Sequence, residues 1–368
     1  MELAIVGLPR SGKTTVFNAL TRGAARAASF AAQRQPTLAV ARVADTRLGV
    51  LADIFQPSAI THAEVTYVDI PAPPEGVGRT RGIYGEYLTQ LQRADALIVV
   101  ARAFDNPTEP DAADGIDAHR DLETMLYELT FADLEVLDRR LAKLAAASKS
   151  AKSADRDTLD RERELISRLK AGLDDGIAVR NQKFGDDDAR RVEDFQFLTG
   201  KPLVLIVNAG EEQLGDLDAL EEAAATGFAT SGFEGVRTAA ICGQLEMELA
   251  QMDPEEEQEF RESLAAGESA PDRVVRLSFQ MLDQITFFTG NHKEVRAWAI
   301  ARGDTALRAA GQIHSDLERG FIRAEVVSYE DLVKAGSLAE AQRRGVFRQE
   351  GRSYAVADGD YLGILFNV

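Results

Sequence analysis

Short apolar runs of strand length recur along much of the chain, separated by longer amphipathic stretches. The runs that predict strands are Leu3–Val6, Glu64–Ile70, Ala96–Ala101, Pro202–Asn208 and Arg237–Ile241. Continuous apolar runs are typical of parallel strands that are buried on both faces, with helices between them supplying the cover. The pattern therefore predicts an α/β fold built on a mostly parallel sheet.

A long helical stretch separates two of these strands. Leucine and isoleucine recur in it at spacings of three, four and seven residues, first at Leu134, Leu137, Leu141 and Leu144, and again at Leu159, Ile166, Leu169 and Leu173. Such spacing places the apolar side chains on one face of each helix. The polar segment Ser148–Asp155 separates the two series, so we predict an antiparallel helical hairpin, a short coiled coil, inserted over residues 116–198.

The final part of the chain has a different pattern of predicted elements. Pro271 follows the acidic stretch Glu255–Glu268, and from Leu277 the elements become shorter. They end in the turn Ala357–Asp360, which lies between two β-prone runs. We therefore predict a separate domain over residues 273–368, and a first domain formed by residues 1–115 and 199–272.

The first predicted strand leads into a motif that carries chemistry. Gly7 to Thr14 spells G-L-P-R-S-G-K-T, the phosphate-binding loop of nucleotide-binding proteins, and a predicted helix follows it. Its glycines turn the chain sharply, so that backbone N–H groups and the helix N-terminus face an anion. Lys13 would reach the β- and γ-phosphates and Thr14 would hold Mg²⁺. The candidate loop residues are Gly7, Pro9, Arg10, Ser11, Gly12, Lys13, Thr14 and Thr15. The alternative, an ordinary glycine-rich turn, is disfavoured by the strand-loop-helix context.

Two further strand ends carry candidate residues. Asp69 ends an apolar strand, as the Mg²⁺-coordinating aspartate of such proteins does; the alternative is an aspartate that caps a turn. Asn208 ends another strand and begins Asn-Ala-Gly-Glu, where a guanine-reading loop would end in aspartate. Glu211 stands in that place, so this motif does not assure guanine recognition.

Composition narrows the cellular setting. Cys242 is the single cysteine, the four histidines lie far apart with no metal-ligand spacing, and no apolar run approaches the length that spans a membrane. A basic-then-apolar leader is absent before the first strand. These features predict a cytoplasmic protein without a membrane partner; we also expect a monomer.

The charge argues against general affinity for nucleic acid. The net charge is −18, whereas binding to DNA or RNA depends on neutralising phosphates. Residues 273–368 hold 13 Lys/Arg and 12 Asp/Glu, a net of +1, which leaves −19 for residues 1–272. We therefore expect no DNA partner, and the C-terminal segment is the better candidate for any contact with RNA.

Together these motifs resemble the YchF family of Obg-related P-loop ATPases. The similar stretches are residues 7–21, N-A-G-E at 208–211, C-G-Q-L-E-M-E from Cys242, KEVRAWAI at 293–300, and residues 311–332 and 357–368. The resemblance implies that ATP is the ligand rather than GTP, with Cys242 and Gly243 at the nucleotide pocket. It also implies a C-terminal TGS module of the β-grasp type and a nucleotide switch that contacts the ribosome through its C-terminal or helical domain.

Three positions depart from the family pattern. Asp69 is followed by Ile70-Pro71-Ala72, which replaces the usual Ile-Ala-Gly and removes the glycine that grips the γ-phosphate; Pro73 and Pro74 then stiffen the segment. Gln33 stands where the family has a Mg²⁺-sensing threonine, unless Thr37 takes that role.

The third departure is Arg10, which replaces an asparagine that helps the family to position a potassium ion. A guanidinium there would supply the positive charge itself; the alternative is a surface cation paired with an acidic neighbour.

These features leave two hypotheses open. One is a slow ATPase, with Lys13, Arg10 and Asp69 as its catalytic groups, that switches its contact with a ribosome. The other is a nucleotide-dependent binding module with little or no hydrolysis, and GTP remains a possible ligand in either case. A small-molecule kinase is disfavoured because the TGS-like tail has no place in it.

Overall fold

The computed structural model describes residues 1–23, 36–71, 82–105, 115–149, 152–228, 232–263 and 269–367. The chain divides into two compact units. The first comprises Met1–Ala39 and Thr66–Pro271, and the second comprises Val40–Val65 and Asp272–Val368. The chain therefore leaves the first unit after Ala39, returns to it at Thr66, and enters the second unit again at Asp272.

The main sheet has six strands in the order β2-β4-β1-β5-β6-β7. These strands are β1 (Glu2–Val6), β2 (Thr37–Arg42), β4 (Glu64–Asp69), β5 (Ala96–Arg102), β6 (Leu203–Asn208) and β7 (Arg237–Ile241). β1 pairs in parallel with β4 and β5, and β6 pairs in parallel with β5 and β7. Every residue of β5 and β6 is buried, as expected of continuous apolar runs covered on both faces. The predicted mostly parallel α/β sheet is confirmed.

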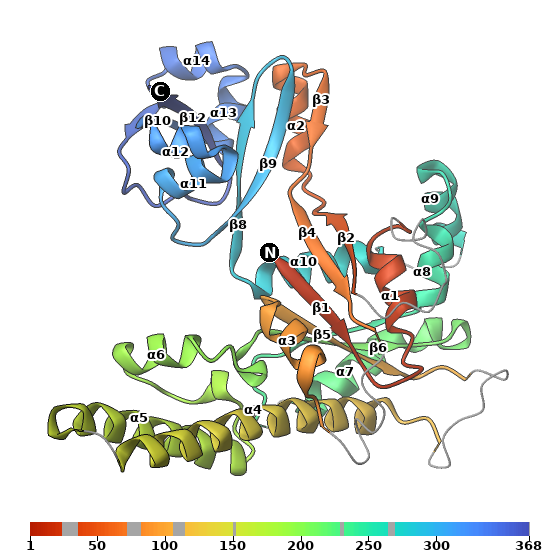
Figure 1. Ribbon diagram of the computed structural model, residues 1–368. Helices are drawn as coiled ribbons and strands as arrows, with labels where there is room; N and C mark the ends of the chain where they lie inside the picture. Colours follow the sequence, from red (N-terminus) through yellow and green to blue (C-terminus); the bar gives the residue numbers. More distant parts are fainter. Residues whose placement is uncertain are drawn as a thin grey trace. The chain divides into compact units, whose positions relative to one another are not determined.

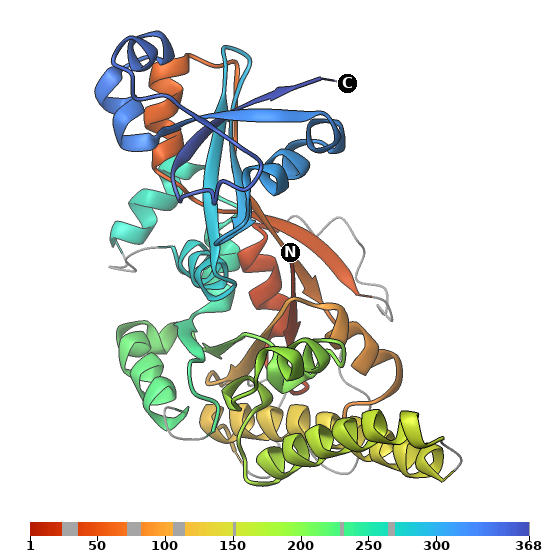
Figure 2. The same ribbon diagram turned by 90° about the vertical axis from the view of Figure 1, so that its left-hand side faces the viewer.

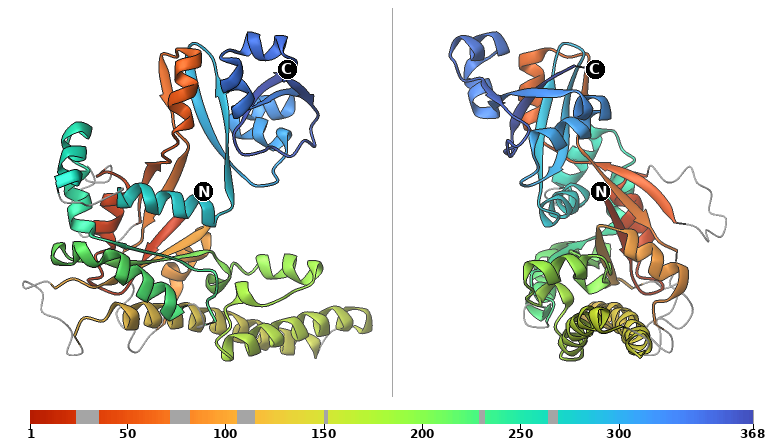
Figure 3. Two further views of the ribbon diagram at one scale, coloured as in Figure 1. Left: turned by 180° about the vertical axis from the view of Figure 1, so that it is seen from behind. Right: turned by 60° about the vertical axis from the view of Figure 1, so that its left-hand side comes forward.

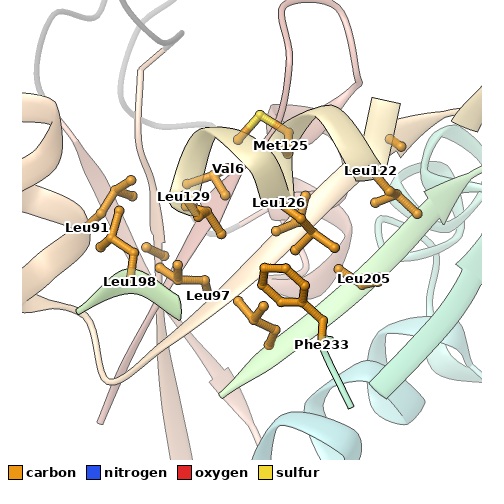
Figure 4. Close-up of a cluster of buried hydrophobic side chains, with 14 of the residues drawn as sticks. Val6, Leu91, Leu97, Leu122, Met125, Leu126, Leu129, Leu198, Leu205 and Phe233 are labelled. Atoms are coloured by element: carbon orange, nitrogen blue, oxygen red, sulfur yellow. The ribbon is translucent and has the colours of Figure 1, made fainter. Parts of the chain in front are cut away.

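Helices connect and cover these strands. In chain order they are α1 (Lys13–Leu20), α3 (Gly85–Arg93), α4 (Ala118–Ser148), α5 (Ser153–Asp174), α6 (Asp186–Glu193), α7 (Leu217–Phe228), α8 (Gly243–Leu249) and α9 (Pro254–Ser263). The N-terminal half of α4 supplies Leu122, Met125, Leu126 and Leu129 to the core. Figure 4 shows these side chains facing Leu97 of β5 and Leu205 of β6. This contact fixes one end of α4 on the sheet.

The C-terminal half of α4 pairs with α5, and the two helices lie side by side in Figures 1 and 3. Their seam buries both apolar series that the sequence picks out, with Leu137, Leu144, Ile166 and Leu169 among the most buried residues. Arg140 binds Glu162 and Lys170 binds Asp138 across the seam. The predicted antiparallel hairpin is therefore present, with α4 ending at Ser148 and α5 beginning at Ser153.

The second unit contains a sheet in the order β11-β10-β12-β8-β9-β3. Its strands are β3 (Ala59–Thr61), β8 (Gln284–Gly290), β9 (Glu294–Ala301), β10 (Phe321–Ser328), β11 (Arg348–Glu350) and β12 (Asp360–Phe366). Its helices are α2 (Arg47–Phe55), α10 (Ala270–Met281), α11 (Ala306–Ile313), α12 (Ser315–Arg319), α13 (Tyr329–Ala335) and α14 (Leu338–Arg343). Most of them lie in the blue, C-terminal part of the chain in Figure 2. α10 begins at the unit boundary, so Pro271 stands in the first turn of a helix, where its missing N–H costs nothing.

Both faces of this sheet are covered. Alternate residues such as Ile285, Phe287 and Ile300 share a core with Ala306 and Ala310 of α11. Residues of the opposite face, such as Phe288 and Tyr361, pack against α2. Phe55 of α2 stacks on Tyr361, and the Arg47 guanidinium lies 5.0 Å from the centre of the Phe288 ring. α2 also packs against β9 and α13.

The sequence assigned all of residues 1–115 to the first domain, yet the structure groups Val40–Val65 with the C-terminal segment. The reason is that β3 extends the C-terminal sheet beside β9 and α2 covers one of its faces. No local pattern in residues 40–65 signals a partner more than 200 residues away. The division into three domains stays a prediction.

Candidate functional site

The G-L-P-R-S-G-K-T loop joins β1 to α1 at the carboxyl end of the main sheet, close to the ends of β4 and β6. Neither of its two glycines has room for a side chain. A Cβ on Gly7 would lie 2.4 Å from the carbonyl oxygen of Val100, and one on Gly12 would lie 2.2 Å from Nδ2 of Asn208. Gly12 also has φ +81°, a left-handed conformation that glycine adopts at no steric cost. The loop therefore has the tight backbone turn that the sequence predicts.

Lys13, Thr14 and Asp69 meet at the start of α1. The Thr14 hydroxyl donates to Oδ2 of Asp69 at 2.8 Å. Lys13 is only 8 % exposed, and burial lowers the pKa of its ammonium, an effect that the nearby Asp69 opposes. Burial likewise raises the pKa of Asp69, opposed by the Thr14 hydrogen bond and by Lys13. A lysine and an aspartate are thus held in a place where water screens them poorly.

The same group of residues has the chemistry of a magnesium site. Mg²⁺ prefers hard oxygen ligands and is commonly held by one carboxylate, a hydroxyl and nucleotide phosphates. Oδ1 of Asp69 is buried and has no hydrogen-bond partner in the described part of the chain. An orphaned carboxylate oxygen is costly to leave unsatisfied, and a bound cation would satisfy it. The residues present therefore fit this ion.

Asn208 ties two segments to the loop. Its Nδ2 donates to the carbonyl of Ser11 at 3.2 Å, and its Oδ1 accepts from the backbone N–H of Gly243 at 3.0 Å. Both bonds are buried. Asn208 therefore links the phosphate loop to the start of α8. The sequence could not predict this positioning role, because the role depends on three segments that meet only in the folded chain.

Beside the loop lies a cavity of about 510 Å³. Its lining brings together candidates from distant parts of the sequence: Arg10, Gly12, Thr15, Asn208, Glu211 and Cys242. Phe104 and Asp105 also line it, and sequence analysis missed both. Phe104 is held by Arg102, whose Nε donates to its carbonyl at 2.8 Å and whose guanidinium lies 5.0 Å from its ring centre. An aromatic residue two positions after the end of a buried strand at this edge is a signal that would have found it.

Arg10 occupies an unusual backbone conformation, with φ +68°. Non-glycine residues adopt this region rarely, and asparagine does so several times more readily than most. The geometry gives a backbone reason for the asparagine that the family carries here. Arg10 is exposed, lines the cavity and already interacts with another group in the structure.

Cys242, which lines the cavity, is the first of the remaining candidates. Cys242 is buried, and desolvation raises the pKa of its thiol. Thr37 begins β2. Gln33, Ala72, Pro73 and Pro74 lie outside the described residues, so the predictions made on them stay predictions.

Within the described ranges, no group of three or more His, Cys, Asp or Glu side chains is arranged to hold a metal ion. None of the helices there is both long and apolar enough to cross a bilayer.

The fold and this site define a P-loop nucleotide-binding protein with a helical insertion and a second unit built around a six-stranded sheet. Residues 2–136 match a family described as "50S ribosome-binding GTPase", and residues 284–367 match the YchF-GTPase C-terminal family, described as a protein of unknown function. The chain belongs to the YchF family. It is 34 % identical to the "Ribosome-binding ATPase YchF" of Bacillus subtilis, over 100 % of both chains, and 34 % identical to that of Escherichia coli O157:H7, over 100 % of this chain and 99 % of the relative.

The likeness extends to a solved structure. The YchF GTPase of Schizosaccharomyces pombe superposes with a TM-score of 0.87 at 25 % identity, and the match covers 99 % of this chain and 97 % of that one. The predicted family, inferred from short motifs at several places along the chain, is confirmed over its whole length.

Proposed function

We propose that this protein binds Mg·ATP, hydrolyses it slowly and acts as a nucleotide switch that associates with the ribosome. The observation that carries the proposal is the meeting of buried Lys13 and Asp69 with the Thr14 hydroxyl, which bonds to Asp69, at the end of a tight glycine loop. The name of the relatives, ribosome-binding ATPase, supports both the ligand class and the partner. A cytoplasmic location and a monomeric state complete the proposal.

Each residue has a distinct part in this scheme. Backbone N–H groups from Gly7 to Thr14 and the Lys13 ammonium bind the phosphates. Thr14 and Asp69 would hold Mg²⁺, which when bound neutralises negative charge on the β- and γ-phosphates. Because Lys13 is shielded from water, its attraction to a phosphate is screened less than it would be at the surface.

The preference for ATP over GTP rests on Glu211. A guanine-reading aspartate accepts two hydrogen bonds from the base edge, whereas the longer glutamate alters the distance from which a carboxylate would approach. Glu211 lines the cavity together with Asn208 and Gly210. Competition calorimetry should show tighter binding of ATP, and Glu211→Asp should shift the preference towards GTP. Tighter binding of GTP by the parent protein would overturn the assignment.

The site itself is tested by Lys13→Ala. Loss of a charge-assisted contact costs about 1.5–3 kcal/mol, or roughly ten- to a hundredfold in affinity. The matched control is Lys293→Ala, an exposed lysine of the second unit. Calorimetric titration with Mg·ATP should show weaker binding for Lys13→Ala only; equal affinity in all three proteins would remove the site from this loop.

A second candidate function is a binding module gated by nucleotide, with little or no turnover. Pro71 favours it, because proline directly after the Asp69–Ile70 strand end has no backbone N–H to offer a phosphate. Measuring phosphate release with and without ribosomes separates the two candidates. Release that rises on adding ribosomes supports the switch; ATP binding without release under either condition supports the module.

A further inference from the structure

The far end of the helical hairpin differs in charge from the rest of the chain. Residues 139–156, the end of α4 and the start of α5, hold six basic residues and one acidic residue, a net of +5 in a protein whose total is −18. The preceding part of α4, residues 118–138, holds one arginine and six acidic residues, a net of −5. The basic residues therefore gather at the hairpin tip, the end remote from the part of α4 that packs on β5.

Several of these charges are available to a partner. Lys143, Lys149 and Lys152 are exposed, and none of them makes an ion pair or side-chain hydrogen bond within the described ranges. Arg140, by contrast, is engaged with Glu162 in the seam. Lys143 lies on α4 and Lys149 directly follows its last residue, six positions further on, which is a rise of about 9 Å at helical geometry. Within the described ranges these three lysines have no counter-ion, so they form a positive surface on an acidic protein.

We propose that the hairpin tip binds the phosphate backbone of RNA, an inference that rests on the proposed association with the ribosome. Residues 139–156 contain no aromatic side chain on which a base would stack, so the contact is electrostatic and independent of sequence. An anionic membrane is the less suitable partner, because surface attachment also needs large apolar side chains. The exposed apolar residues of the tip are alanines.

The salt dependence of RNA binding tests the proposal. Each phosphate contact contributes about −0.7 to −0.9 to the slope of log K against log salt. Replacing Lys143, Lys149 and Lys152 with glutamine should therefore reduce the slope by about 2 to 3 and weaken binding about a hundredfold at roughly 0.1 M salt. The probe is a fluorescein-labelled RNA stem-loop, followed by anisotropy between about 50 and 200 mM KCl.

A matched triple variant keeps the total charge change equal. Lys293→Gln, Arg308→Gln and Lys334→Gln remove three exposed charges from the second unit, the segment that the sequence favours for RNA. This variant should retain the parent slope, and both variants should bind Mg·ATP as the parent does. Loss of RNA binding in the second-unit variant alone would overturn the proposal, as would an unchanged slope in the tip variant.

Co-sedimentation with purified ribosomes distinguishes the two proposals. A parent that binds the stem-loop through the tip but does not co-sediment would refute ribosome association and leave the tip site intact. A parent that co-sediments equally well with and without the three tip lysines would refute the tip site and leave the proposed function standing. Tighter binding to phosphatidylglycerol vesicles than to the stem-loop, lost in the tip variant, would assign the surface to membranes instead.

Discussion

At the residue scale, Arg10 combines a permanent charge with a left-handed backbone at the edge of the nucleotide cavity. If the guanidinium replaces a potassium ion, turnover should be equal in sodium and potassium buffers. Removing it should then lower kcat by at least about tenfold while changing ATP affinity little, because such a contact strengthens as negative charge shifts in the transition state.

The left-handed conformation decides which variant tests this. Arg10→Ala changes the charge and also disfavours φ +68°, whereas Arg10→Asn removes the charge but tolerates that backbone. Both variants should lose turnover, and only Arg10→Asn should regain it in potassium. Potassium-dependent turnover in the parent protein, or full turnover in Arg10→Asn with sodium, would mean that Arg10 is a surface cation without a part in the reaction.

At the element scale, Asp133 fastens the helical insertion to the main sheet. It is fully buried in α4 and accepts hydrogen bonds from the backbone N–H groups of Leu198 and Thr199, and from the Thr199 hydroxyl, just before β6 begins. Burial nevertheless raises the pKa of Asp133 to about 6. The cost of desolvating the carboxylate therefore exceeds the gain from three donors.

The direction of the pH dependence follows from this pKa. An unfolded aspartate titrates near 3.9, so the folded protein holds the proton more tightly between about pH 4 and 6. The contribution of Asp133 to the free energy of unfolding is fully present below pH 4 and declines, by up to about 3 kcal/mol, as the pH rises through 6.

Urea unfolding of the parent and of Asp133→Asn, followed by circular dichroism at several pH values, measures this effect. The stability of the parent relative to the variant should fall from pH 4 to pH 6 and then level off. Glu135→Gln, an exposed neighbour on α4, is the control and should show no such trend. A relative stability that rises over this interval would mean that the three hydrogen bonds outweigh desolvation.

At the scale of the whole molecule, the second unit depends on a segment from the N-terminal part of the chain. Leu51 of α2 is 1 % exposed and belongs to the helix that covers the Phe288 face of the C-terminal sheet. Leu51→Ala should cost about 2–5 kcal/mol, the usual range for a buried leucine. The loss should appear in β8, β9 and β12 rather than in the strands of the main sheet.

Hydrogen exchange with peptide-level mass spectrometry locates the effect. Amides of residues 284–301 and 360–366 should exchange faster in Leu51→Ala, while those of β5 and β6 stay protected. Val50→Ala, at a 37 % exposed position of the same helix, should leave both regions unchanged. Faster exchange confined to the first unit would show that α2 belongs there.

Because α2 and β3 belong to the second unit, removing the C-terminal segment would also disturb residues 40–65. A chain that ends near Pro271 would leave α2 and β3 without the sheet that they cover and extend. Point substitutions such as those at the hairpin tip and on the second unit keep both units intact, and therefore test binding without exposing a buried face.

The sequence by itself determined the parts that depend on local pattern. The parallel strands, the hairpin seam and the glycine loop all follow from side-chain periodicity or from a motif of eight adjacent residues, and Lys13, Thr14 and Asp69 follow from their positions at strand and loop ends. These signals are short in range, because a strand or a helix face repeats every two to four residues.

Only the tertiary structure decided which distant segments meet. It brought Asn208 between Ser11 and Gly243, placed Phe104 in the cavity wall, and grouped residues 40–65 with the C-terminal segment in the second unit. It also showed that Arg10 has a left-handed backbone conformation, which an arginine in the sequence does not predict. Such facts depend on hydrogen bonds and packing between segments tens to hundreds of residues apart, and local periodicity carries no information about which pairings will form.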